Sequence, residues 1–104
     1  MNIKLEKFLV IYNYYEIKNC QKNQTNLSFF IRYGLCNNNC IKLNIDYLFI
    51  VNDICEVLIP NLNNIEILKL KDYHYDFESW RIGIDYIEKK IIYRFMKNIA
   101  IYFL

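Results

Sequence analysis

The sequence predicts a single α/β domain built on an open, mainly parallel sheet of three to four strands with two amphipathic helices. Two short apolar runs, at residues 8–12 and 45–51, are rich in β-branched and aromatic side chains. Such runs are typical of strands that are buried on both faces of a parallel sheet. Two other stretches carry apolar residues at helical spacing. We therefore expect the order strand, helix, strand, strand, helix.

The first helix is expected at about residues 18–33. Polar residues there alternate with an apolar stripe that has helical spacing, made of Leu27, Phe30, Ile31 and Leu35. Gly34 lies where a helix end favours the left-handed conformation, so we expect Gly34 to close this helix.

Later segments supply the remaining elements. Residues 65–70 mostly alternate apolar and charged side chains, which predicts a half-covered or edge strand. Asp76 is a suitable N-cap for a second helix. The apolar stripe of that helix has steps of four, three and four residues, at Trp80, Ile84, Ile87 and Ile91. Residues 91–104 fit a continued helix and a turn into a fourth strand equally well.

Charge and hydropathy exclude several classes of protein. The net charge of +2 comes from 13 basic and 11 acidic residues scattered along the chain, without the basic face of a nucleic-acid-binding protein. Residues 1–7 carry charges where a signal peptide would be apolar, and no apolar run approaches the roughly 20 residues of a membrane span. We expect a cytoplasmic protein, in the host cytoplasm if the gene is viral, with no nucleic-acid partner and no membrane span.

The cysteines and the single histidine do not predict a metal site. Without a signal peptide, the four cysteines are expected to be free thiols. Cys36 and Cys40 have a spacing that could present two thiolates to zinc, but no second pair completes four ligands. His74 has no partner in the sequence, which favours a solvated loop residue. The residues themselves thus indicate no cofactor.

Three segments, in order, resemble a family of GT-A-type glycosyltransferases that act in polysaccharide and surface-glycan synthesis. The first is Phe-Leu-Val-Ile-Tyr-Asn-Tyr-Tyr-Glu at residues 8–16, similar to the family's first strand with its terminal Tyr-Glu. The second is Asn-Leu-Ser-Phe-Phe, followed by Gly-Leu, within residues 26–35. The third is Asp-Phe-Glu-Ser-Trp at residues 76–80. The resemblance covers roughly residues 7–90 and implies a partial Rossmann-like sheet.

In this family the front portion binds the nucleotide of a sugar donor at the carboxyl ends of the strands. The resemblance would place the nucleotide against Tyr12, Asn52, Asp53 and Asp76. Each of these residues also has a purely structural explanation. Tyr12 can belong to the core, Asn52 and Asp53 can form a turn, and Asp76 can cap a helix.

The family also uses a divalent metal, held by an Asp-x-Asp motif, and a later acceptor region. Neither is recognisable here. The pair Asp76 and Glu78 has the spacing of the metal motif, but its position at a helix start is a sufficient explanation for both carboxylates. We therefore expect residues 1–104 to form a truncated glycosyltransferase-like domain that binds a nucleotide sugar without transferase activity of its own. Its expected partners are a nucleotide sugar, a full-length glycosyltransferase or a second copy. The alternative is a small α/β interaction module that dimerises or docks through an open sheet edge.

Overall fold

A computed structural model describes residues 7–35, 45–72, 76–90 and 99–104. These residues form four strands and two α-helices, the first of which continues into a π-helical turn, η1. In chain order the elements are β1 (Lys7–Tyr15), α1 (Lys22–Phe29), η1 (Phe30–Gly34), β2 (Ile45–Asn52), β3 (Ile65–Leu70), α3 (Asp76–Glu88) and β4 (Ile99–Phe103).

The strands form one open parallel sheet in the order β3-β2-β1-β4, which confirms the predicted fold class. Phe8 of β1 lies opposite Ile45 of β2 on one side and Ala100 of β4 on the other. The chain thus proceeds outward from β1 to β3 and then returns to place β4 on the opposite side of β1. In open α/β sheets, ligands bind outside the carboxyl ends of the strands near such a reversal of strand order.

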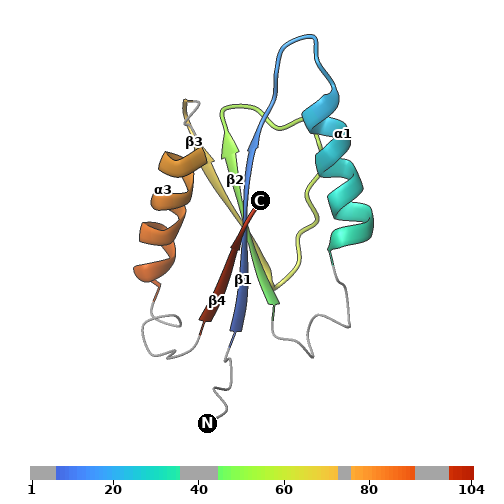
Figure 1. Cartoon of the computed structure of the whole chain (residues 1–104). Coiled ribbons are helices and arrows are strands. Elements are labelled where there is room, and N and C mark those ends of the chain that lie inside the picture. The colour runs from blue at the N-terminus through green and yellow to red at the C-terminus, as the bar shows by residue number, and fades with distance from the viewer. Residues whose placement is uncertain (1–6, 36–44, 73–75, 91–98) are drawn as a thin grey trace.

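The two helices cover opposite faces of the sheet (Figure 1). Because side chains alternate along a strand, Leu9 and Ile11 of β1 point to the face where Ile87 of α3 packs. On the other face, Tyr14 of β1 and Phe49 of β2 pack with Leu27 of α1. Burial on both faces explains why β1 and β2 read as continuous apolar runs.

The helical segment ends at Gly34, as predicted, and Leu35 follows in an extended conformation. The expected left-handed conformation of Gly34 is wrong, because no glycine among the described residues has a positive φ. A Cβ at Gly34 would lie 2.7 Å from a ring carbon of Phe30. Glycine is therefore needed to make room for an aromatic ring rather than to reach a left-handed backbone. The helix also begins at Lys22, later than expected.

The question left open for the last segment is answered in part, because Ile99–Phe103 forms a strand parallel to β1. Ile91, His74, Cys36 and Cys40 lie outside the described residues. Cys20 and Cys55, which are described, are free thiols. Within the described ranges, no helix is long and apolar enough to span a bilayer.

Candidate functional site

A cavity of about 520 Å³ lies at the carboxyl ends of β1 and β2. Its walls are the β1–α1 loop, the start of α1 and the connection that follows β2. The polar residues that line it are Glu16, Lys18, Asn19, Gln21, Gln24, Asn52, Asp53 and Glu56. A neighbouring recess of about 320 Å³ shares Glu16, Asn52 and Asp53 with it. The size is within the range of small-molecule sites in proteins.

Asp53 presents an exposed carboxylate to this cavity. Its backbone has a φ of 69°, in the left-handed region that Asp and Asn tolerate better than most residues. The backbone N–H of Asp53 donates to the carbonyl oxygen of Leu70 at 2.8 Å, which ties the turn to the end of β3. In the part of the chain that the structure describes, the Asp53 carboxylate accepts no hydrogen bond.

Asn52 also lines the cavity, but its side chain is only 2% exposed and serves mainly to join structural elements. Its Nδ2 donates to Asn13 Oδ1 at 2.6 Å and to the carbonyl oxygen of Tyr14 at 2.9 Å. The Ser79 hydroxyl of α3 donates to Asn52 Oδ1 at 3.4 Å. Because both amide hydrogens are used within the protein, Asn52 can offer a ligand only its carbonyl oxygen.

Asp76 is connected to Asn52 through a residue that the sequence analysis missed. Asn13 Nδ2 donates to Asp76 Oδ1 at 2.8 Å, while Asn13 Oδ1 accepts from Asn52. Asn13, Asn52, Ser79 and Asp76 form what we call the polar network, which links the carboxyl ends of β1 and β2 to the beginning of α3. The sequence signal that could have revealed Asn13 is its position two residues after Ile11 and four after Leu9, on the side of β1 that faces α3. A buried amide at this position needs hydrogen-bond partners.

Tyr12 is placed away from the cavity. Its ring lies between those of Phe30 and Phe49 on the α1 face, with centroid distances of 5.0 Å and 5.6 Å. Burial raises the pKa of its hydroxyl. Of the four residues expected near a nucleotide, Asn52 and Asp53 line the cavity. Asp76 does not line it and is linked to Asn52 only through Asn13. Tyr12 packs in an aromatic cluster.

Glu16 holds the two loops of the cavity together. Its Oε1 accepts from the Tyr14 hydroxyl at 3.0 Å and from the backbone N–H of Glu56 at 2.6 Å. Gln24 Nε2 adds a longer contact to Glu56 Oε2 at 3.4 Å. Burial and the hydrogen bond to Glu16 raise the pKa of the Tyr14 hydroxyl, which therefore stays protonated as a donor. Glu16 thus shapes one wall of the cavity.

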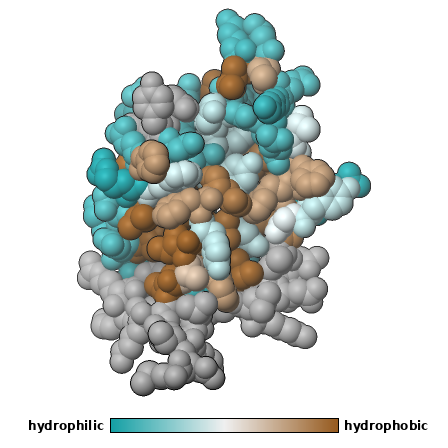
Figure 2. Space-filling model, viewed as in Figure 1, coloured by the Kyte–Doolittle hydropathy of each residue, from teal (hydrophilic) through white to brown (hydrophobic). Residues whose placement is uncertain are grey.

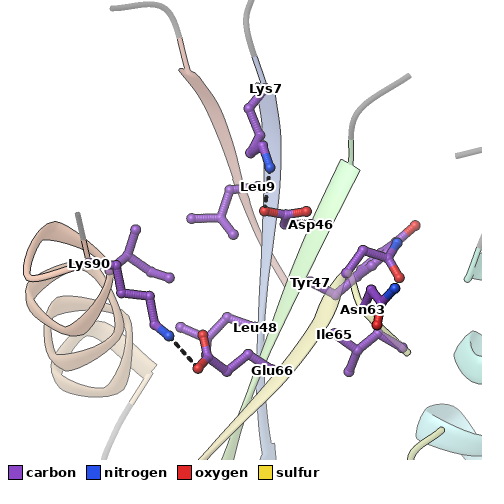
Figure 3. Close-up of a pocket in the computed structure, with 11 residues that line it drawn as sticks. Lys7, Leu9, Asp46, Tyr47, Leu48, Asn63, Ile65, Glu66 and Lys90 are labelled. Carbon is purple, nitrogen blue, oxygen red and sulfur yellow. Dashed lines mark hydrogen bonds and ion pairs between the residues drawn. The ribbon is translucent and has the colours of Figure 1, made fainter. Parts of the chain in front are cut away.

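A second cavity, of about 330 Å³, lies at the amino ends of the strands (Figure 3). Its charged residues form two ion pairs, and its apolar lining comes from Leu9, Leu48, Ile65 and Ile87. Lys7 Nζ contacts Asp46 Oδ2 at 2.8 Å, and Lys90 of α3 pairs with Glu66 of β3. The hydrogen bond to Glu66 raises the pKa of Lys90. Because the charges neutralise each other, this cavity offers a charged ligand less than the one at the carboxyl ends.

Within the described residues, no three His, Cys, Asp or Glu side chains gather into a metal-binding group, and Asp76 Oδ1 accepts a hydrogen bond from Asn13. Comparison with protein-family models, with curated proteins and with solved structures gave no match. The resemblance to glycosyltransferases therefore depends on the sequence motifs and stays a prediction.

Proposed function

We propose that this chain binds a nucleotide sugar in the cavity at the carboxyl ends of β1 and β2. The observation that carries the proposal is the Asp53 carboxylate, which is exposed to this cavity directly after β2 and accepts no hydrogen bond among the described residues. The proposal concerns binding alone, and no transfer step is derived.

The position of Asp53 suits the ribose of a nucleotide. In dinucleotide-binding α/β folds, an acidic residue accepts hydrogen bonds from ribose hydroxyl groups. Asp53 occupies the end of the second strand, and its backbone is held by the hydrogen bond to Leu70. The backbone at Asp53 is thus held in place, and its carboxylate has acceptor sites available for two hydroxyl donors.

The beginning of α1 is available for the diphosphate. Gln21, the N-cap, makes no side-chain hydrogen bond to the helix, and the first turn holds no acidic residue. The first N–H groups of a helix favour an anion. Gln21 and Gln24 line the same cavity as Asp53. Lys18 is outnumbered there by the carboxylates of Glu16, Asp53 and Glu56, so the helix start rather than the net charge would have to bind the diphosphate. Ribose and diphosphate could therefore be bound within one cavity.

Isothermal titration calorimetry with UDP, GDP and representative UDP- and GDP-sugars tests this proposal. We expect at least one of these ligands to bind, and Asp53→Asn to weaken it roughly ten- to a hundredfold, as expected for a lost hydrogen bond to a charged group. Asparagine tolerates a positive φ, so this variant should keep the turn.

The matched control is Glu88→Gln, which neutralises an exposed carboxylate on α3 outside the cavity. The control should bind as the wild type does. The proposal would be contradicted by silence from every nucleotide, or by equal affinities of the wild type and Asp53→Asn for the ligand that binds.

A further inference from the structure

The two outer strands of the described sheet differ in charge. β3 carries Glu66 and Lys69, and Lys71 follows it directly. β4 and the residue after it, Leu104, contain no charged side chain. Charged residues, lysine above all, are a common protection of sheet edges against pairing with another chain. The β3 edge has this protection and the β4 edge does not.

The backbone of β4 offers hydrogen-bonding groups on its outer side. The N–H of Leu104 donates to the carbonyl oxygen of Ile11 at 2.8 Å, and the carbonyl oxygen of Leu104 accepts from the N–H of Asn13 at 3.0 Å. Since backbone direction alternates along a strand, the N–H and C=O groups of Ile101 and Phe103 point away from β1. Among the described residues, no strand lies on that side.

Apolar side chains flank this open backbone on both faces. The exposed fractions are 38% for Ile101, 54% for Tyr102, 40% for Phe103 and 51% for Leu104. Figure 2, viewed as in Figure 1, shows apolar side chains gathered over β4 in the middle of this face of the molecule. Ring contacts hold two of these side chains in place, Tyr102 against Phe8 and Phe103 against Trp80. The edge is therefore an ordered apolar surface.

We propose that β4 is the site of self-association, in which β4 of a second copy pairs antiparallel with it across a two-fold axis. The sheets of the two copies would then continue into one another. A second copy suits this edge because neither β4 carries a charged side chain, so that antiparallel pairing brings no like-charged side chains together. A two-fold axis also uses the same surface on both chains and closes the assembly at a dimer. This proposal does not depend on nucleotide binding.

Analytical ultracentrifugation over a range of concentrations tests the pairing. The wild-type chain should approach twice its monomer mass of 12.8 kDa as concentration rises. Ile101→Lys places two like charges in the interface and should raise the dissociation constant at least about tenfold. The control is Ile67→Lys on β3, because Ile67 is 39% exposed and also lies on an edge strand. It should dimerise as the wild type does.

Circular dichroism should show that both variants remain folded. Amide hydrogen exchange of the wild type gives a second measurement that needs no variant. The amides of Ile101 and Phe103 should become protected as concentration rises, while that of Tyr102, which points toward β1, should be protected throughout.

A wild-type chain that stays monomeric up to its solubility limit would overturn the proposal and leave the edge to a strand of a different protein. A dimer that Ile67→Lys disrupts as strongly as Ile101→Lys would overturn it too. So would a dimer that Ile101→Lys leaves intact.

Discussion

Replacing Asn52 by alanine removes the centre of the polar network. The change eliminates the two hydrogen bonds from Asn52 Nδ2, to Asn13 at 2.6 Å and to the carbonyl oxygen of Tyr14 at 2.9 Å. It also removes the acceptor that the Ser79 hydroxyl uses at 3.4 Å. Asn13, Asn52 and Ser79 are all buried, so water cannot readily replace these bonds.

The two shorter hydrogen bonds should each contribute about 1 kcal/mol net, and the longer one less. The buried carbonyl oxygens of Asn13 and Tyr14 each lose a donor, and desolvation of such groups adds to the loss. We expect Asn52→Ala to lower the free energy of unfolding by about 3 kcal/mol. For a domain of this size, that loss corresponds to a fall in melting temperature of roughly 12–24 °C.

Urea unfolding followed by the fluorescence of Trp80, the only tryptophan of the chain, measures this change. The control is Asn61→Ala, in an exposed position of the connection between β2 and β3, which should alter stability by less than about 0.5 kcal/mol. A loss for Asn52→Ala below about 1 kcal/mol would show that the network is not a structural clamp, and the reasoning about Asn52 would fail.

Three further outcomes are expected from the same unfolding assay. In Gly83→Ala the new Cβ would lie 2.8 Å from Ile50 Cδ1. Ile50 is fully buried and has little room to move, so overpacking in the upper part of the usual range of about 1–3 kcal/mol should outweigh the helix-propensity gain of about 1 kcal/mol. Burial and the hydrogen bond to Glu16 raise the pKa of the Tyr14 hydroxyl above 10.0, so the folded state favours the neutral phenol. This contribution to the free energy of unfolding is present below pH 10 and declines above it. The free energy of unfolding of Tyr14→Phe should therefore vary less with pH above 10. Lys7→Met removes the 2.8 Å contact to Asp46 and should cost about 2 kcal/mol, which Lys7→Arg should partly restore.

The two central strands could be predicted from the sequence because strands that are buried on both faces consist of consecutive apolar residues. β1 and β2 lie at the centre of the sheet, and the run from Leu48 to Val51 is buried on both faces. β3 lies at an edge of the described sheet, as its mostly alternating apolar and charged residues predicted. The last strand could not be decided, since residues 91–104 are apolar in a way that suits a helix or a strand. Only pairing with β1, from the other end of the sequence, distinguishes the two.

Of the four predicted site residues, Asn52 and Asp53 line the candidate cavity and Tyr12 and Asp76 do not, and whether the cavity binds a ligand stays a prediction. Asn52 and Asp53 were expected at the carboxyl end of a strand and lie in the cavity there. The bonds from Asn13 to Asn52 and Asp76 join residues 39 and 63 positions apart, so no local pattern reveals them. Gly34 shows the opposite difficulty: its identity is explained by the ring of Phe30 four residues earlier, not by the helix-end conformation that glycine usually indicates.

The strand order also bears on how the chain folds. β1 is central, yet its neighbour β4 is the last of the described elements along the chain. One edge of β1 therefore stays unpaired until the residues of β4 have been synthesised. During synthesis, β1, β2 and β3 can assemble first, because they are closer in sequence and loop closure costs them less entropy. Until β4 docks, that nascent sheet exposes one edge of the mostly apolar strand β1. Aggregation on or near the ribosome should therefore compete with the final step of folding.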